Sequence, residues 1–195
     1  MFKAIVKLVI ALISQPAKTW VMLKERWDNF DQEADSDRFE FFLKNFLHPF
    51  IGILTIAAFL SVCTRQEFEI EYALKSSILT FVSSFGGFYL TSYLVNEIWK
   101  GVFKKEDSLQ LCQVFVGISS ALMFTLDLIW LLLPDFFFLY IFILYTFYIV
   151  WEGSVTFMSV EDSIRMKFTT IISLAIICIP QVIEKVLILL MPGLR

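Results

Sequence analysis

Five long stretches of the chain are almost free of charged residues. They cover residues 45–64, 75–98, 109–133, 136–158 and 168–191. A helix needs about 20 apolar residues to cross the hydrocarbon core of a bilayer, and each stretch supplies about that number. The pattern therefore predicts an all-α integral membrane protein whose five transmembrane helices form one domain, residues 44–195.

The preceding segment, residues 1–43, has a different pattern. Only ten uncharged residues separate Lys7 from Lys18, which is too few to cross a membrane. We therefore expect an amphipathic N-terminal helix lying in the membrane interface, followed by an acidic, solvated linker at residues 28–38. No small-x-small motif follows the apolar run, so we do not expect cleavage as a signal peptide. The two helical faces comprise Lys3, Lys7, Ala11 and Ser14 on one side and Phe2, Ile5, Val9, Leu12 and Ile13 on the other.

Lysine and arginine are distributed unevenly between the segments that flank the predicted spans. One side of the membrane receives twelve of these residues and the other side receives three. Because positively charged loops are retained in the cytoplasm, the count predicts a cytoplasmic N-terminus and an external C-terminus. Only Pro134 and Asp135 separate the third and fourth spans, which predicts a tight helical hairpin. Pro180 lies inside the fifth span and is expected to kink it.

Small and hydroxyl-bearing residues recur at a helical period in two of the spans. Small residues let helices approach closely in a membrane. We expect the two stripes to face each other as a packing seam, and a polar path through the membrane is the alternative. The second span carries Ser76, Thr80, Ser83, Ser84, Gly87 and Thr91, and the third carries Gly117, Ala121 and Thr125.

Composition and motifs exclude several classes of protein. Hydrophobic residues make up 58% of the 195, and the net charge of −3 is too small to indicate a nucleic-acid partner. The sequence has no phosphate-binding glycine loop, no H-E-x-x-H and no G-x-S-x-G motif. The three cysteines stand apart, and the single histidine, His48, has no nucleophile near it in the sequence. We therefore expect no enzymatic activity, no catalytic residue, no cofactor and no metal.

The few ionisable residues of the spans lie toward the span ends. Asp127, Glu152, Glu184 and Lys185 are all placed where they can reach headgroups or water. The middle of the bilayer is left without an ionisable group, which argues against a proton- or sodium-coupled transporter. Aromatic residues run all round the fourth span, and we expect them to face lipid.

Two segments resemble a known family. The first is Gln15-Pro16-Ala17-Lys18-Thr19-Trp20, ahead of a charged helix, and the second is Tyr145-x-x-Tyr148-x-x-Trp151-x-Gly153 in the fourth span. With five spans and a cytoplasmic N-terminus, the chain resembles the prokaryotic branch of the Yip (Ypt/Rab-interacting protein) domain family. Eukaryotic members bind small GTPases and work in vesicle trafficking. The chain lacks the Asp-Leu-Tyr-Gly-Pro stretch that they carry before the first span, which argues against small-GTPase binding.

The resemblance and the missing catalytic motifs favour a non-enzymatic, membrane-organising or adaptor protein of a prokaryotic inner membrane. Its contacts would be membrane lipids and a protein partner at the cytoplasmic N-terminal segment. The alternative is a small transporter, channel or lipid-moving protein that uses the polar stripe of the second and third spans. A cavity that reaches into the membrane would favour the alternative, and a solid core would favour the adaptor.

Overall fold

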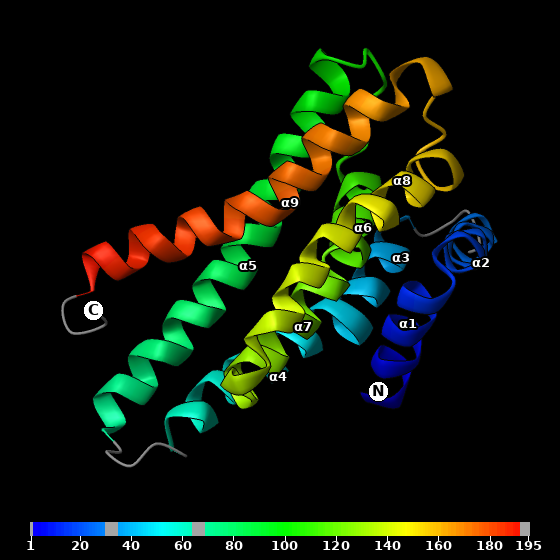
Figure 1. Ribbon diagram of the computed structural model, residues 1–195. Helices are drawn as coiled ribbons and strands as arrows, with labels where there is room; N and C mark the ends of the chain where they lie inside the picture. The colour runs from blue at the N-terminus through cyan, green and yellow to red at the C-terminus, as the bar shows by residue number, and fades with distance from the viewer. Residues whose placement is uncertain (1, 30–34, 64–68, 192–195) are drawn as a thin grey trace.

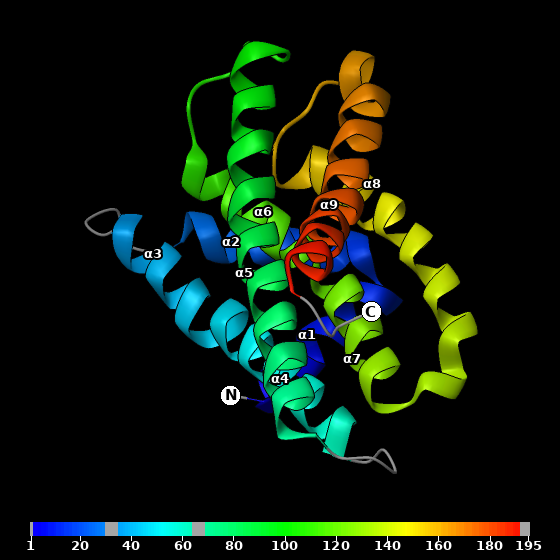
Figure 2. The same cartoon turned by 90° about the vertical axis from the view of Figure 1, so that its left-hand side faces the viewer.

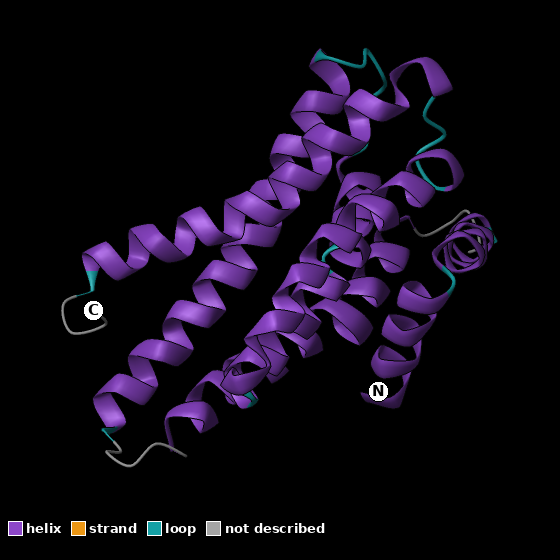
Figure 3. Cartoon of the chain, in the orientation of Figure 1, coloured by secondary structure: helices purple, strands orange, loops and turns teal. Residues whose placement is uncertain are grey.

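The computed structural model of the chain describes residues 2–29, 35–63 and 69–191. Within those ranges every regular element is a helix and there is no β-strand (Figure 3). The all-α class predicted from the sequence is confirmed. In chain order the elements are α1 (Phe2–Ser14), α2 (Pro16–Asp28), α3 (Asp35–Phe42), the π-helical turn η1 (Leu43–Leu47), α4 (His48–Cys63), α5 (Ile70–Gly101), α6 (Leu109–Ser119), α7 (Ala121–Leu132), the 3-10 helix η2 (Pro134–Tyr145), α8 (Thr146–Thr156) and α9 (Asp162–Leu190).

Four helical stretches are long and apolar enough to cross a membrane, and the bent pair of α6 and α7 makes a fifth when the two are counted as one span. The four are Phe39–Cys63, Ile70–Gly101, Pro134–Thr156 and Asp162–Leu190. They coincide with the predicted spans, so the lengths and composition expected of a multi-pass membrane protein are confirmed. α5 begins before residue 75, where Glu71 and Lys75 form an ion pair across one helical turn.

The third span is not one continuous helix over 109–133. α6 and α7 are bent by 40° at their junction. There the Ser120 hydroxyl donates a hydrogen bond to the Val116 carbonyl oxygen at 2.8 Å. A serine that bonds to the preceding turn competes with the helical ladder and bends helices.

The fourth span turns back on the third as a hairpin, as Pro134 predicts. Leu133 has φ −135° and ψ 71°, and the Phe136 N–H donates to the Leu133 carbonyl oxygen at 3.0 Å. Pro134 then begins η2, a position that suits proline because its missing N–H would have had no helical partner. Phe137 is 63% exposed and Ile141 69% exposed. Apolar side chains this exposed fit the predicted contact with lipid.

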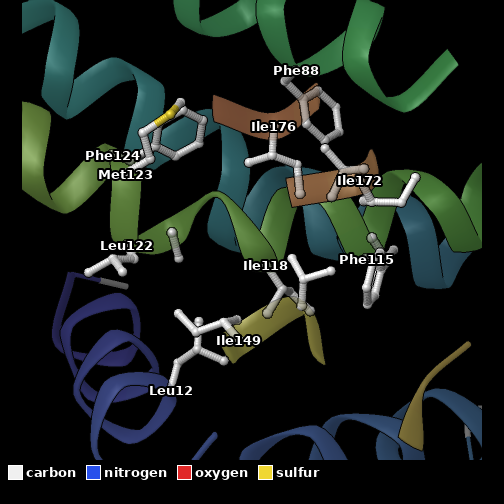
Figure 4. Close-up of a cluster of buried hydrophobic side chains, with 14 of the residues drawn as sticks. Leu12, Phe88, Phe115, Ile118, Leu122, Met123, Phe124, Ile149, Ile172 and Ile176 are labelled. Atoms are coloured by element: carbon white, nitrogen blue, oxygen red, sulfur yellow. The ribbon is translucent and has the colours of Figure 1, made fainter. Parts of the chain in front are cut away.

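α5 is the central helix of the bundle and packs against α4, α6 and α9. Figure 1 shows α5 and α9 diverging toward the end where α5 begins and α9 ends, which we call the open end and which faces the viewer in Figure 2. α9 remains helical through Pro180 and changes direction along its length, in keeping with the predicted kink (Figure 1). The buried apolar side chains form one cluster to which α1, α5, α6, α8 and α9 all contribute (Figure 4).

The N-terminal helix α1 is docked on the protein. Ile5, Val9 and Leu12 are buried, and α1 contacts α2 and α7. Val6 and Ile10 remain exposed. Ile5, Val9 and Leu12 of the predicted apolar face are therefore covered by this chain, whereas Ile13 is 38% exposed and, with Val6 and Ile10, leaves apolar surface for the membrane interface. The acidic linker is also shorter than predicted, because α3 begins at Asp35, and residues 30–34 lie outside the described residues.

The loop between α5 and α6 is held by a buried amide. Asn96 is 3% exposed, and its Nδ2 donates to Asp107 Oδ1 at 2.9 Å. Its Oδ1 accepts the Ser108 backbone N–H at 3.3 Å. Lys100 Nζ donates to the other Asp107 oxygen at 3.2 Å. The hydrogen bonds from Asn96 and Lys100 hold the pKa of Asp107 below its usual value.

Candidate functional site

Gly87, in the stripe of α5, faces α9 and not the stripe of the third span. A Cβ atom at Gly87 would lie 2.9 Å from Pro180 Cβ, so α9 crosses α5 where the side chain is absent. Gly117 instead makes room for Phe42 and Phe88, whose nearest ring atoms would lie 2.7 Å and 3.2 Å from a Cβ atom. The predicted seam does not form at these two glycines, because α5 presents the Phe88 ring and not its stripe to Gly117.

A polar cavity lies beyond this crossing, toward the open end. Its volume is about 500 Å³, and α5, α7, η2 and α9 line it, leaving it open on the remaining side. That volume lies in the range of pockets that bind small molecules. The polar side chains that line it are Tyr72, Ser76, Thr80, Ser83, Ser84, Asp127, Trp130, Tyr140, Gln181, Glu184 and Lys185.

The α5 stripe is therefore divided by the crossing. Its first four residues, Ser76, Thr80, Ser83 and Ser84, line the cavity, and Gly87 contacts Pro180. Thr91 is buried on the other side of the crossing. Ala121 and Thr125 do not line the cavity, and the Thr125 hydroxyl donates to the Ala121 carbonyl oxygen at 2.7 Å.

A chain of hydrogen bonds links three of the enclosing elements. Gln181 Nε2 of α9 donates to the Tyr140 hydroxyl of η2 at 3.4 Å. That hydroxyl donates in turn to Asp127 Oδ1 of α7 at 3.3 Å. The Tyr140 ring also meets the Trp130 ring edge to face, with 6.3 Å between their centroids. The cavity wall around Asp127 therefore combines hydrogen-bonding groups with the aromatic rings of Trp130 and Tyr140.

The charges that line the cavity are unbalanced. Asp127 and Glu184 contribute two carboxylates, and Lys185 contributes one ammonium group. Asp127 is half-buried, whereas Lys185 is exposed. Among the described residues, no lysine or arginine forms an ion pair with either carboxylate. A carboxylate held away from water without a cation is costly, particularly in a membrane.

Hydroxyl groups without a hydrogen-bond partner among the described residues lie on both sides of the crossing. Ser84 lines the cavity and is 7% exposed, and its hydroxyl makes no hydrogen bond within the part of the chain that the structure describes. Beyond the crossing, the hydroxyls of Thr91 on α5 and of Thr169 and Ser173 on α9 are buried without a partner in the described ranges. Buried hydroxyls are usually hydrogen-bonded, so this series is unusual for a packed core.

The two segments that resemble the Yip family lie against each other at the N-terminal helices. Trp20 is fully buried, and its Nε1 donates to the Ile149 carbonyl oxygen at 2.9 Å. Gly153 makes room for the indole, since a Cβ atom there would lie 2.5 Å from Trp20 Cε2. Pro16, at the first position of α2, is buried as well. α2 is therefore fixed on α8 by residues far apart in the sequence.

The two tyrosines of the same segment differ in their roles. The Tyr145 hydroxyl donates to the Ile13 carbonyl oxygen of α1 at 2.9 Å. Tyr148 is 45% exposed and lies beside Tyr145, with 5.3 Å between the ring centroids. Tyr145 thus helps to attach the N-terminal helices, and Tyr148 forms no hydrogen bond with the described residues of those helices.

No family model matches the chain, and no match was found among curated proteins or solved structures. The resemblance to the Yip family therefore stays a prediction.

The sequence alone did not point to Tyr140, Gln181 and Trp130, the cavity residues that accompany Asp127. Each lies in a different element, and no spacing in the sequence connects them. Asp127 and Glu184 are visible in the sequence as single carboxylates within two separate predicted spans. The useful signal was the presence of both carboxylates near the same predicted membrane face.

Proposed function

We propose that the chain is a small multi-pass transporter that takes up its substrate in the cavity between α5, α7 and α9. The observation that carries the proposal is the cavity itself, with hydroxyl, amide and carboxylate groups from separate spans around about 500 Å³. Ionisable side chains inside a membrane-spanning bundle are rare, and they mark substrate or ion pathways. On the orientation predicted from the loops, the open end faces the exterior of a prokaryotic inner membrane.

The buried hydroxyls beyond the crossing supply the inner part of the path. The crossing of Gly87 and Pro180 closes the cavity toward the cytoplasm, and Thr91 and Ser173 lie past it. Proline in a membrane helix weakens the local hydrogen-bond ladder and allows that helix to bend. Movement of the end of α9 that carries Pro180 would connect the two polar regions. Substrate would then leave on the cytoplasmic side.

Thiol accessibility in membranes tests the first half of the proposal. In a chain whose own cysteines are replaced, Thr80→Cys should react with a charged, membrane-impermeant thiol reagent applied from outside. Phe81→Cys is the matched control, because it lies at the same depth on the exposed, lipid-facing side of α5. If Thr80→Cys reacts no faster than Phe81→Cys, the cavity holds no water and the proposal fails.

The second half is tested beyond the crossing. Thr91→Cys should react slowly with the same reagent when it is applied from the cytoplasmic side, because the inner path opens only in some molecules. A Thr91→Cys variant that stays inert from both sides, while Thr80→Cys reacts, would leave a binding site without a path. The proposal that the protein is a transporter would then be wrong.

The fixed position of α2 favours a second candidate, the adaptor predicted from the sequence. α2 is anchored through Trp20 and exposes Val21 and Met22, at 46% and 42%, on its outer side. A rigid helix with exposed apolar residues at a cytoplasmic face suits a protein partner. A photo-crosslinking residue at Met22 should then form an adduct with one protein in native membranes, whereas one at Phe137 should label lipid. Lipid adducts alone at Met22 would place α2 in the membrane interface and contradict the adaptor.

A further inference from the structure

We infer that the ligand of the cavity is a small organic ammonium ion with an aromatic or aliphatic body. This inference rests on the proposed function, since it names the substrate class of the same cavity. It follows from the lining of the cavity: two carboxylates, an unpartnered hydroxyl and an aromatic corner line one space, and Lys185 is the one cationic side chain among the described residues that line it.

The carboxylates set the sign of the ligand's charge. Asp127 accepts one hydrogen bond, from Tyr140, and its other oxygen has no partner among the described residues. Glu184 faces the same cavity from α9. An ammonium group placed between them would supply the missing positive charge and N–H donors. An anion would meet two carboxylates and only the exposed Lys185.

The aromatic corner sets the kind of cation. Trp130 and Tyr140 stand edge to face beside Asp127. Aromatic faces attract ammonium groups, and the attraction is strongest at tryptophan. The same rings offer apolar surface to the ligand's body. Leu79, Met123 and Ile188 extend that apolar surface along the cavity.

The cavity is unsuited to a bare metal ion. No group of three or more histidine, cysteine, aspartate or glutamate side chains is close enough to hold a metal among the described residues. The volume of about 500 Å³ is also far larger than a single inorganic ion needs. The Ser84 hydroxyl, which lines the cavity and has no hydrogen-bond partner in the described ranges, provides an acceptor for one N–H of an amine.

Protection of Thr80→Cys from the thiol reagent tests the ligand class with three matched probes. Benzylammonium, benzyl alcohol and benzoate share a ring and differ in charge. Benzylammonium should slow the labelling of Thr80→Cys at a concentration at least tenfold lower than benzyl alcohol requires, and benzoate should give no protection. Sodium chloride at the same ionic strength should not reproduce the effect.

Substitutions of the carboxylates test which of them binds the ammonium group of the probe. Asp127→Asn should raise the concentration of benzylammonium needed for protection at least tenfold, and Glu184→Gln should raise it several-fold. Asp135→Asn, at the exposed hairpin turn outside the cavity, should leave it unchanged. If Asp127→Asn does not fold, the Glu184→Gln variant and the comparison of charged and neutral probes still decide the matter.

The outcomes separate this inference from the proposed function. If Thr80→Cys reacts readily but benzyl alcohol or sodium protects it as well as benzylammonium does, the cavity is hydrated and the ammonium class is wrong. Protection by benzoate would also overturn the class. If Thr80→Cys reacts no faster than Phe81→Cys, the proposed function itself has failed.

Discussion

Two neighbouring glycines of α5 give opposite expectations for the same substitution. A Cβ atom at Gly87 would lie 2.9 Å from both Cβ and Cγ of Pro180 and 3.1 Å from its Cα. A Cβ atom at Gly86 would meet nothing within 4 Å. Both residues lie in the interior of the same helix, so the change to alanine has the same effect on helix propensity at each.

The expected change in the free energy of unfolding has two contributions, helix propensity and the steric clash with Pro180. Replacing a helical glycine by alanine stabilises a helix by about 0.5–1 kcal/mol. Overpacking of a tight contact costs about 1–3 kcal/mol, and here the proline ring is rigid and part of the clash involves backbone. Gly86→Ala should therefore be slightly more stable than the wild type. Gly87→Ala should be less stable than Gly86→Ala by about 1–3 kcal/mol.

Thermal unfolding in a mild detergent measures the difference. For a chain of this size, a difference of about 2 kcal/mol corresponds to roughly 4–8 °C in Tm. Combining Gly87→Ala with Pro180→Gly should recover part of the loss, because the substitution removes both the Cβ and the Cγ atom of the proline. Equal melting temperatures for Gly86→Ala and Gly87→Ala would show that α9 does not cross α5 at this point.

Three further predictions concern other parts of the fold. Gly153→Ala should destabilise the protein by about 1–3 kcal/mol, because its Cβ atom would meet a buried indole, whereas Gly52→Ala, with open space around it, should not; melting temperatures in detergent check both. Asn96→Ala should cost about 1–3 kcal/mol by leaving the α5–α6 loop without its buried amide, and Glu106→Ala, in the same loop, should be nearly neutral. The stabilisation that Asp107 gains from Asn96 and Lys100 is fully present above the unfolded pKa of its carboxyl group, and it is lost as pH falls through the lowered folded pKa. The loss of stability caused by Asn96→Ala should therefore become smaller in acid. Ser108→Cys should react with an impermeant thiol reagent only from the cytoplasmic side, and labelling only from outside would reverse the predicted orientation.

Hydrophobic patterning was sufficient to predict the class of the fold and the approximate positions of its spans. Apolar stretches of this length have few other stable solutions, since every backbone polar group in a membrane must be paired within the chain. Pro134 fixed the hairpin for an equally local reason, because it cannot continue the helix that precedes it. These features depend on neighbouring residues, and they are therefore visible in the sequence.

The helix that each stripe faces depended on the tertiary structure. The period of the α5 stripe indicated that its members share one side of the helix, but not whether α6, α7 or α9 covers that side. α9 packs on the stripe because Pro180 fits against Gly87, whereas Phe42 and Phe88 occupy the space beside Gly117. Steric complementarity between distant residues leaves no periodic signal in the sequence.

The formation of the cavity also depended on the tertiary structure. The sequence by itself determined that the chain is an all-α protein with stretches that can span a membrane, and that carboxylates lie near the ends of some of them. Only the packing of α7, η2 and α9 around the start of α5 brought Asp127, Tyr140 and Glu184 to one space. The physical reason is that local hydrophobicity and backbone hydrogen bonding determine each helix separately, whereas the crossing and bending of helices determine which polar side chains share a cavity.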